Sequence, residues 1–112
     1  MNGRIFKYLL SINADTLAAS QNIYSYKVSL DLPRDHRILH LGSQKGEVYV
    51  WVLINTDQDS IDNSRQIDFH LVATGVEIEE IGLGTYLETI HLMDDTFIYH
   101  VFVDHHPQLE GA

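Results

Sequence analysis

The stretch GSQKGEVYVWVLI, residues 42–54, decides the fold. Lys45 and Gly46 separate two extended segments with the composition of a tight turn, so we predict a β-hairpin around residues 44–46. Residues 48–54 are apolar or aromatic at every position, and a strand that is apolar on both faces usually lies at the centre of a sheet. We therefore predict a central strand here, and we expect Trp51 to lie in the core.

Alternation of apolar and polar residues continues on both sides of this hairpin, which is the pattern of half-buried strands. It predicts strands over residues 26–32, 36–43, 65–74, 85–93 and 96–104, with a polar loop at 55–64 and a loop or short edge element at 76–84. Short strands with turns between them predict a mainly β fold. We expect a compact antiparallel sandwich or partly open barrel of six or seven strands, with at most one short helix, near residues 13–22.

Length and composition indicate one globular domain. The chain has 112 residues, of which 45% are hydrophobic, so we expect a single domain over residues 1–112 with 102–112 as a partly frayed tail. Cysteine is absent, which excludes disulfides and cysteine–zinc sites. No signal-peptide pattern opens the chain, and no run reaches the roughly 18 apolar residues of a membrane span. We expect a cytoplasmic protein that does not enter a membrane.

Charge is unevenly distributed along the chain, whose net charge is −9. Residues 1–45 hold six basic and three acidic residues, a net charge of +3, whereas residues 46–112 hold one basic and thirteen acidic residues, a net charge of −12. Such an acidic surface repels nucleic acid and attracts basic partners by long-range steering, although an excess of acids also serves solubility alone. We therefore do not expect direct nucleic-acid binding. The acidic residues that we expect to contact a partner are Asp57, Asp59, Asp62, Glu77, Glu79 and Glu80.

Histidines gather near the C-terminus, in the stretch FIYHVFVDHH, residues 97–106. A turn at residues 94–95 would place residue 89 opposite His100, so that His91 and His100 share a face about 7–8 Å apart, with Asp104 further along it. Two imidazoles and a carboxylate are zinc ligands in principle, and these three are the metal candidates. Leu87, Ile98 and Phe102 fall on the same face, however, which favours a histidine-bearing structural strand.

Catalytic and nucleotide-binding motifs are missing from the sequence. There is no dinucleotide-binding glycine pattern, no phosphate-binding loop and no serine-nucleophile elbow. The paired carboxylates Glu79–Glu80 and Asp94–Asp95 lie in expected loops, where carboxylates are normally solvated. We expect no bound cofactor and no enzymatic activity.

The ordered set of segments resembles a family of small phage and prophage proteins of unknown function. It comprises FKYLLSI, then VSLDLPRDHRILHLGSQKGEVYVWVLINTD, FHLVATGVEI and YLETIHLMDDTFIYHVF, within residues 5–103. The resemblance implies a β-rich, phage-encoded protein that works in the cytoplasm of a bacterial host. It implies no catalytic residues, and it places His100 in a recurring strand pattern.

Three hypotheses of function follow. The first is a non-enzymatic binding protein whose acidic surface binds, and inhibits, a basic host or bacterial-defence protein. The second is a protein that binds or sequesters a small anionic ligand such as a signalling nucleotide, for which the candidate residues are Arg4, Lys7, Arg34, Arg37 and Lys45. The third is a metal-dependent enzyme built on His91, His100 and Asp104.

We also expect a homodimer. The apolar residues Leu87, Ile98 and Phe102, opposite the inferred core face of the last hairpin, offer more hydrophobic surface than one thin sheet covers. A second sheet of the same chain would cover this surface in a monomeric sandwich; alternatively, a two-fold interface near this hairpin would bury it between two copies, which is the arrangement we expect.

Overall fold

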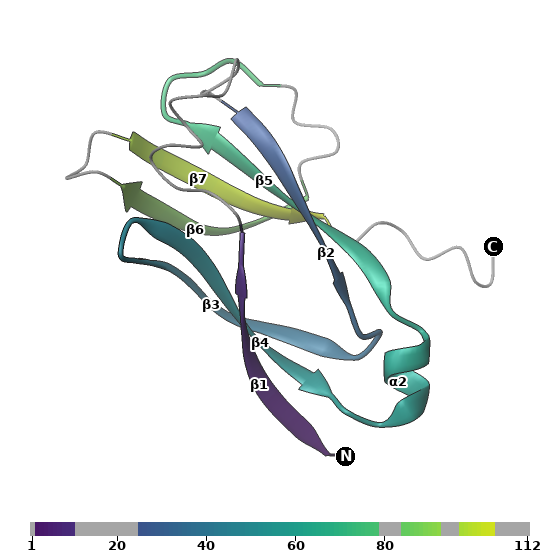
Figure 1. Ribbon diagram of the computed structural model, residues 1–112. Helices are drawn as coiled ribbons and strands as arrows, with labels where there is room; N and C mark the ends of the chain where they lie inside the picture. The colour runs from purple at the N-terminus through teal and green to yellow at the C-terminus, as the bar shows by residue number, and fades with distance from the viewer. Residues whose placement is uncertain (1, 11–24, 79–83, 93–96, 105–112) are drawn as a thin grey trace.

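The computed structural model describes residues 2–10, 25–78, 84–92 and 97–104. Within these ranges the chain forms strands and one short helix, which Figure 1 shows. The elements are β1 (Gly3–Leu9), β2 (Ser25–Leu32), β3 (His36–Gln44), β4 (Glu47–Asn55), α2 (Gln58–Asp62), β5 (Arg65–Ala73), β6 (Thr85–Leu92) and β7 (Phe97–Asp104).

The strands form two open antiparallel sheets, which we call sheet A and sheet B. Sheet A has three strands in the order β1-β4-β3, and sheet B has four in the order β2-β5-β7-β6. The two sheets lie as layers around a shared hydrophobic core (Figure 1). The prediction of a mainly β, sandwich-like fold is confirmed, and the sheets do not close into a barrel.

The β3–β4 hairpin forms where the sequence predicts it. Gln44 pairs with Glu47 across a loop of Lys45 and Gly46, and both loop residues have positive φ, 53° and 79°. A turn with two positive φ angles matches the right-handed twist of the strands, and glycine adopts one of those angles at little cost. The turn therefore sets the register of the hairpin on which sheet A is built.

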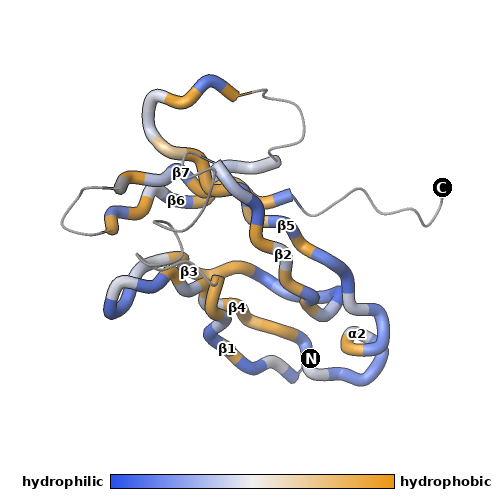
Figure 2. The backbone as a smooth tube through the Cα atoms, turned by 45° about the horizontal axis from the view of Figure 1, so that its top comes forward, coloured by the Kyte–Doolittle hydropathy of each residue, from blue (hydrophilic) through white to orange (hydrophobic). Residues whose placement is uncertain are grey.

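Strand β4 is central in sheet A, as predicted, but only one of its faces lies in the core. Val48, Val50 and Val52 are fully buried between the sheets, and Figure 2 shows the hydrophobic residues that run along this strand. On the opposite face, Tyr49 and Trp51 are only half-buried. The prediction that Trp51 lies in the core is wrong, because β1 and β3 flank β4 within the sheet and no described element covers the outer face.

The β6–β7 hairpin has the predicted register, with one exception. Thr89 pairs with His100 and His91 with Ile98, which leaves buried Ile90 on the core face. The exception is a β-bulge between Tyr86 and Glu88. An extra residue in one strand shifts the alternation beyond it, so Leu87, predicted on the histidine face, packs against the core instead.

Three further expectations concern the two connecting segments and the C-terminal end of the chain. Residues 55–64, predicted as a polar loop, contain helix α2. The helical turn expected near residues 13–22 lies outside the described residues. Residues 102–104, assigned to the frayed tail, are the end of β7, and residues 105–112 lie outside the description.

Candidate functional site

The short helix α2 is held against the corner between β2 and β3. Its first turn begins at Asp57, whose backbone carbonyl accepts hydrogen bonds from the N–H groups of Ser60 (3.0 Å) and Ile61 (3.2 Å). The Ser60 side chain is buried, with 1% of its surface exposed. A helix of five residues is not stable by itself, so its tertiary contacts decide whether it forms.

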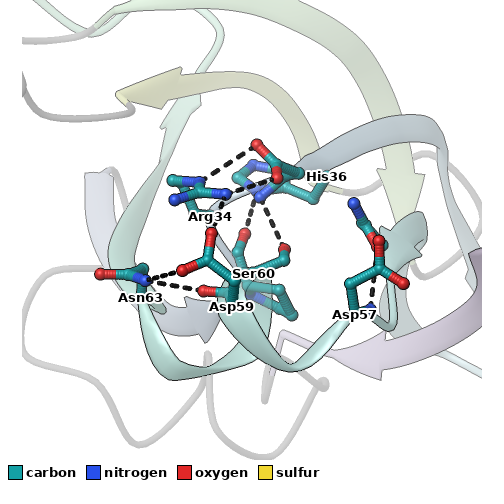
Figure 3. Close-up of polar contacts among 9 residues, drawn as sticks. Arg34, His36, Asp57, Asp59, Ser60 and Asn63 are labelled. Atoms are coloured by element: carbon teal, nitrogen blue, oxygen red, sulfur yellow. Dashed lines mark hydrogen bonds and ion pairs between the residues drawn. The ribbon is translucent and has the colours of Figure 1, made fainter. Parts of the chain in front are cut away.

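Ser60 supplies two of those contacts through its backbone and its hydroxyl. Its carbonyl oxygen accepts the Arg34 backbone N–H at 3.0 Å, and its Oγ accepts the Asp35 backbone N–H at 3.0 Å. Next to them, the His36 ring donates from Nδ1 to the Pro33 carbonyl at 2.7 Å, an assignment that follows because a carbonyl can only accept. Figure 3 shows how these groups converge.

Arg34 joins the helix to the corner through two carboxylates. Its Nη2 lies 2.7 Å from Asp59 Oδ2 and 3.0 Å from Asp35 Oδ2, while its Nε donates to Asp35 Oδ1 at 3.3 Å. Asn63 donates to the backbone carbonyl of Asp59 at 2.7 Å. We call this assembly the α2 corner, which comprises Arg34, Asp35, Asp57, Asp59, Ser60, Asp62 and Asn63. Figure 3 labels Arg34, Asp57, Asp59, Ser60 and Asn63 of this set.

The ion pairs of the α2 corner shift the titration of its members. Hydrogen bonding from Arg34 lowers the pKa of Asp35 below its ordinary value. Hydrogen bonds to Asp35 and then to Asp59 raise the pKa of Arg34. Arg34 and Asp35 therefore stay charged around neutral pH, and the Arg34 guanidinium already has two anionic partners.

The structure brings together half of the acidic residues predicted to bind a partner. Asp57, Asp59 and Asp62 lie on one exposed turn, where Asp62 accepts a hydrogen bond from Gln58 Nε2 at 2.7 Å. Glu77 is exposed but lies beyond the other end of β5, whose nine residues span about 26 Å at the rise of a strand. Glu79 and Glu80 lie outside the described residues. The described acids therefore form two separate groups.

The basic residues predicted to bind an anionic ligand converge only in part. Arg34 and Arg37 line a cleft of about 500 Å³, together with Asp35, His36, Leu53 and Asn55. Lys45 lies in the β3–β4 turn, at the opposite end of β3, about 27 Å from Arg37 at the rise of a strand.

Two other bases of that set lie on β1, on opposite faces. Lys7 donates from Nζ to Gln44 Oε1 at 3.1 Å, and the same atom lies 4.5 Å from the centroid of the Tyr49 ring. Arg4 pairs with the core residue Ile54, so it faces away from Lys7. Lys7, Arg4 and Lys45 are therefore not part of the Arg34–Arg37 cleft.

The histidine face of the last hairpin is a hydroxyl network. The two ring nitrogens of His100 lie close to threonine hydroxyls, with Nε2 at 2.8 Å from Thr74 Oγ1 and Nδ1 at 3.0 Å from Thr89 Oγ1. His91 and His100 are diagonal neighbours, as predicted, but Asp104 lies four residues from His100 along β7, about 13 Å away. Within the described ranges, no three His, Asp or Glu side chains are placed to hold a metal ion.

The outer face of sheet A was missed as a candidate surface. Trp51 lies there beside Tyr49, with ring centroids 6.3 Å apart, and next to His40, at 5.4 Å. The run of residues 48–54, which is apolar or aromatic at every position, could have indicated this surface. A chain of this length forms two layers, and each layer has an outer face, so about half of the apolar residues of this strand lie on that outer face.

These features define a small open β sandwich whose polar and charged groups gather at an exposed corner and on one exposed sheet face. The chain belongs to the family described as a domain of unknown function (DUF7352), which matches residues 1–111. No curated protein and no solved structure matches it. The family agrees with the expected resemblance to an uncharacterised family. In the part of the chain that the structure describes, no helix is long and apolar enough to cross a membrane.

Proposed function

We propose that this protein is a non-enzymatic binding protein, a phage or prophage accessory protein that acts in the cytoplasm of a bacterial host. Its partner is a host or defence protein with a basic surface, and binding inhibits that partner. The observation that carries the proposal is the α2 corner, which presents the carboxylates of Asp35, Asp57, Asp59 and Asp62 on a hydrogen-bonded framework. The origin in a phage rests on the sequence resemblance alone.

The geometry of the corner suits recognition of cations. Asp57 and Asp62 make no ion pair among the described residues, so a partner's lysine or arginine can approach them without displacing an internal cation. The buried contacts of Ser60 hold the turn in place before binding, which reduces the entropy lost on association. The −12 net charge of residues 46–112 accelerates encounter with a basic partner at low ionic strength.

Affinity capture from a bacterial lysate tests this function. The wild-type protein is compared, at low and high salt, with the double variant Asp57→Asn/Asp62→Asn. The control Glu77→Gln/Glu88→Gln removes the same charge at exposed positions outside the corner. We expect a captured protein that high salt releases and that the Asp57/Asp62 variant fails to retain. Capture that ignores salt, or that is lost only in the control, would contradict the proposal.

A second candidate function is sequestration of a small anionic ligand in the cleft at Arg34 and Arg37. Its volume of about 500 Å³ is within the range of small-molecule sites. Arg37 is exposed and makes no ion pair among the described residues, so it is the cation that would bind a phosphate. Thermal-shift measurements with nucleotides on wild type and Arg37→Gln test this candidate, since a ligand that binds only the folded state raises the melting temperature. An unchanged melting temperature at saturating nucleotide would exclude it.

A further inference from the structure

In the fold, the charge asymmetry of the sequence becomes a difference in net charge between sheet A and the rest of the described chain. Sheet A with its hairpin turn carries four bases and one acid, a net charge of +3. The other described residues carry three bases and nine acids, a net charge of −6. The bases of sheet A are Arg4, Lys7, Arg37 and Lys45, and its acid is Glu47.

Two of these bases lie on the outer face of sheet A, among apolar and aromatic side chains. The strand pairing places Ile5, Leu53 and Arg37 in one row across the sheet, and Lys7, Trp51 and His40 in the next. We call this surface the cationic face, which comprises Ile5, Lys7, Arg37, Tyr49, Trp51 and Leu53. Ile5 is 61% exposed, which is high for an isoleucine in a strand. Glu47, at the end of the face, accepts a hydrogen bond from the Tyr49 hydroxyl at 2.9 Å.

We propose that the cationic face is a second docking surface, which binds an acidic segment of a partner protein with an apolar side chain packed on Trp51. Tryptophan, tyrosine and arginine are the residues that most often dominate binding energy at protein interfaces, and here they surround an exposed aliphatic patch. Lys7 and Arg37 flank Trp51 and Leu53 on opposite edge strands, so carboxylates on either side of an apolar anchor meet complementary charge. This surface shares no acidic residue with the α2 corner, and the inference therefore goes beyond the proposed function.

Charge complementarity selects an acidic partner over a second copy of the chain. When two sheets pack face to face about a two-fold axis, the same surface lies on both sides. The cationic face would then meet its own Lys7 and Arg37, and like charges at an interface oppose association.

The ring contacts also select a protein segment over single-stranded nucleic acid. Stacking of a base requires an open aromatic face. The Lys7 ammonium lies over the face of the Tyr49 ring, 4.5 Å from its centroid, so this ring is not open to a base.

Trp51 is the single tryptophan of the chain, so its fluorescence reports directly on occupation of this face. The probes are a short peptide of alternating glutamate and leucine, the same peptide with lysine in place of glutamate, and a short oligothymidylate. We expect the acidic peptide alone to shift the emission of Trp51 in a saturable, salt-sensitive titration. The variant Lys7→Gln/Arg37→Gln should weaken this binding about tenfold. The control Arg4→Gln/Lys45→Gln removes two charges from the same sheet but not from this face, and it should bind as wild type does.

Three results would overturn the inference. The first is an acidic peptide that leaves the emission unchanged at all concentrations, with circular dichroism showing folded protein. The second is an equal or stronger response to oligothymidylate, which would assign the face to nucleic acid. The third is a dimeric wild type that sedimentation shows to become monomeric in Trp51→Ala, which would assign the face to a second copy. None of these results depends on the α2 corner, so they leave the proposed function to its own test.

Discussion

Replacing Ser60 with alanine is expected to loosen the α2 corner. The Ser60 side chain is 1% exposed, and its Oγ accepts the Asp35 backbone N–H at 3.0 Å. A buried donor that loses its acceptor costs about 1–3 kcal/mol. Asp35 is exposed, so water reaches part of this site and the cost falls at the lower end. The better helix propensity of alanine offsets up to about 0.5 kcal/mol.

The expected net loss is about 1 kcal/mol in the free energy of unfolding, which corresponds to a fall of about 3–6 °C in melting temperature for a domain of this size. Urea unfolding followed by circular dichroism measures it, because the midpoint shifts by about 0.5 M at an ordinary slope. The matched control is Ser64→Ala. The exposed Ser64 hydroxyl also makes a local hydrogen bond, to the Ile61 carbonyl at 2.7 Å, and its loss should stay within about 0.5 kcal/mol.

The variant Arg34→Met separates the buried contact from the surface ion pairs of the corner. Ion pairs between exposed side chains contribute little, because water screens them and both side chains lose freedom. We therefore expect Arg34→Met to lower the free energy of unfolding less than Ser60→Ala does. Equal effects of Ser60→Ala and Ser64→Ala, or a larger effect of Arg34→Met, would refute the reasoning that a buried hydroxyl holds the helix in place.

Four further predictions concern backbone strain, a buried hydroxyl, alkaline pH and assembly. Gly84→Ala should destabilise the fold by more than about 2 kcal/mol in thermal unfolding, since φ is +88° and a Cβ would overlap the Val103 carbonyl. The control Gly46→Ala has a similar φ of +79° but open space around the residue, so it should cost only about 1 kcal/mol. Tyr26→Phe should raise the free energy of unfolding by about 1 kcal/mol in urea titration, because the buried Tyr26 hydroxyl has no hydrogen-bond partner among the described residues, and a decrease would show that it has one. Burial, and then the neighbouring Tyr99, raise the pKa of Tyr26 in the folded protein, whereas unfolded tyrosine ionises near about pH 10. Above that pH, ionisation therefore favours the unfolded chain and lowers the free energy of unfolding. Tyr26→Phe removes this ionisation, so its urea midpoints should fall less steeply above about pH 10. The homodimer expected at the last hairpin should appear in light scattering and dissociate in Phe102→Asp; a monomeric wild type would end that prediction.

Local sequence patterns were sufficient for six of the strands and for the register of the last hairpin, whereas β1 was not predicted. Alternation along residues 26–32 and 65–73 identified the faces that lie in the core, because side chains of a strand point to opposite faces in turn. The Lys45–Gly46 pair identified the β3–β4 turn, because only certain residues tolerate positive φ at both positions. The short connection between β6 and β7 determined the register in which Thr89 pairs with His100. Each of these predictions depends on neighbours in sequence.

Features that depend on distant contacts were not predictable in this way. Helix α2 has a loop-like composition, and it forms where Ser60 meets the backbone of Arg34 and Asp35, about 25 residues away in sequence. The bulge that turns Leu87 toward the core depends on the neighbouring strand and on the space beneath the sheet. Alternation by itself assigns one face to every second residue, so it cannot locate an extra residue in a strand.

The two outer faces of the sandwich differ, and this difference determines where a partner gains most by binding. On sheet B, the outward-facing Val72 is only 5% exposed, since Glu77 and Ile78 line the same hollow beyond the end of β5. Phe102 packs edge-on against Tyr86 with ring centroids 5.7 Å apart. Sheet A leaves Ile5 61% exposed next to a half-buried tryptophan. Burial of apolar surface contributes about 25 cal/mol per Å², so covering Ile5 and Trp51 would contribute to the binding that we propose for the cationic face.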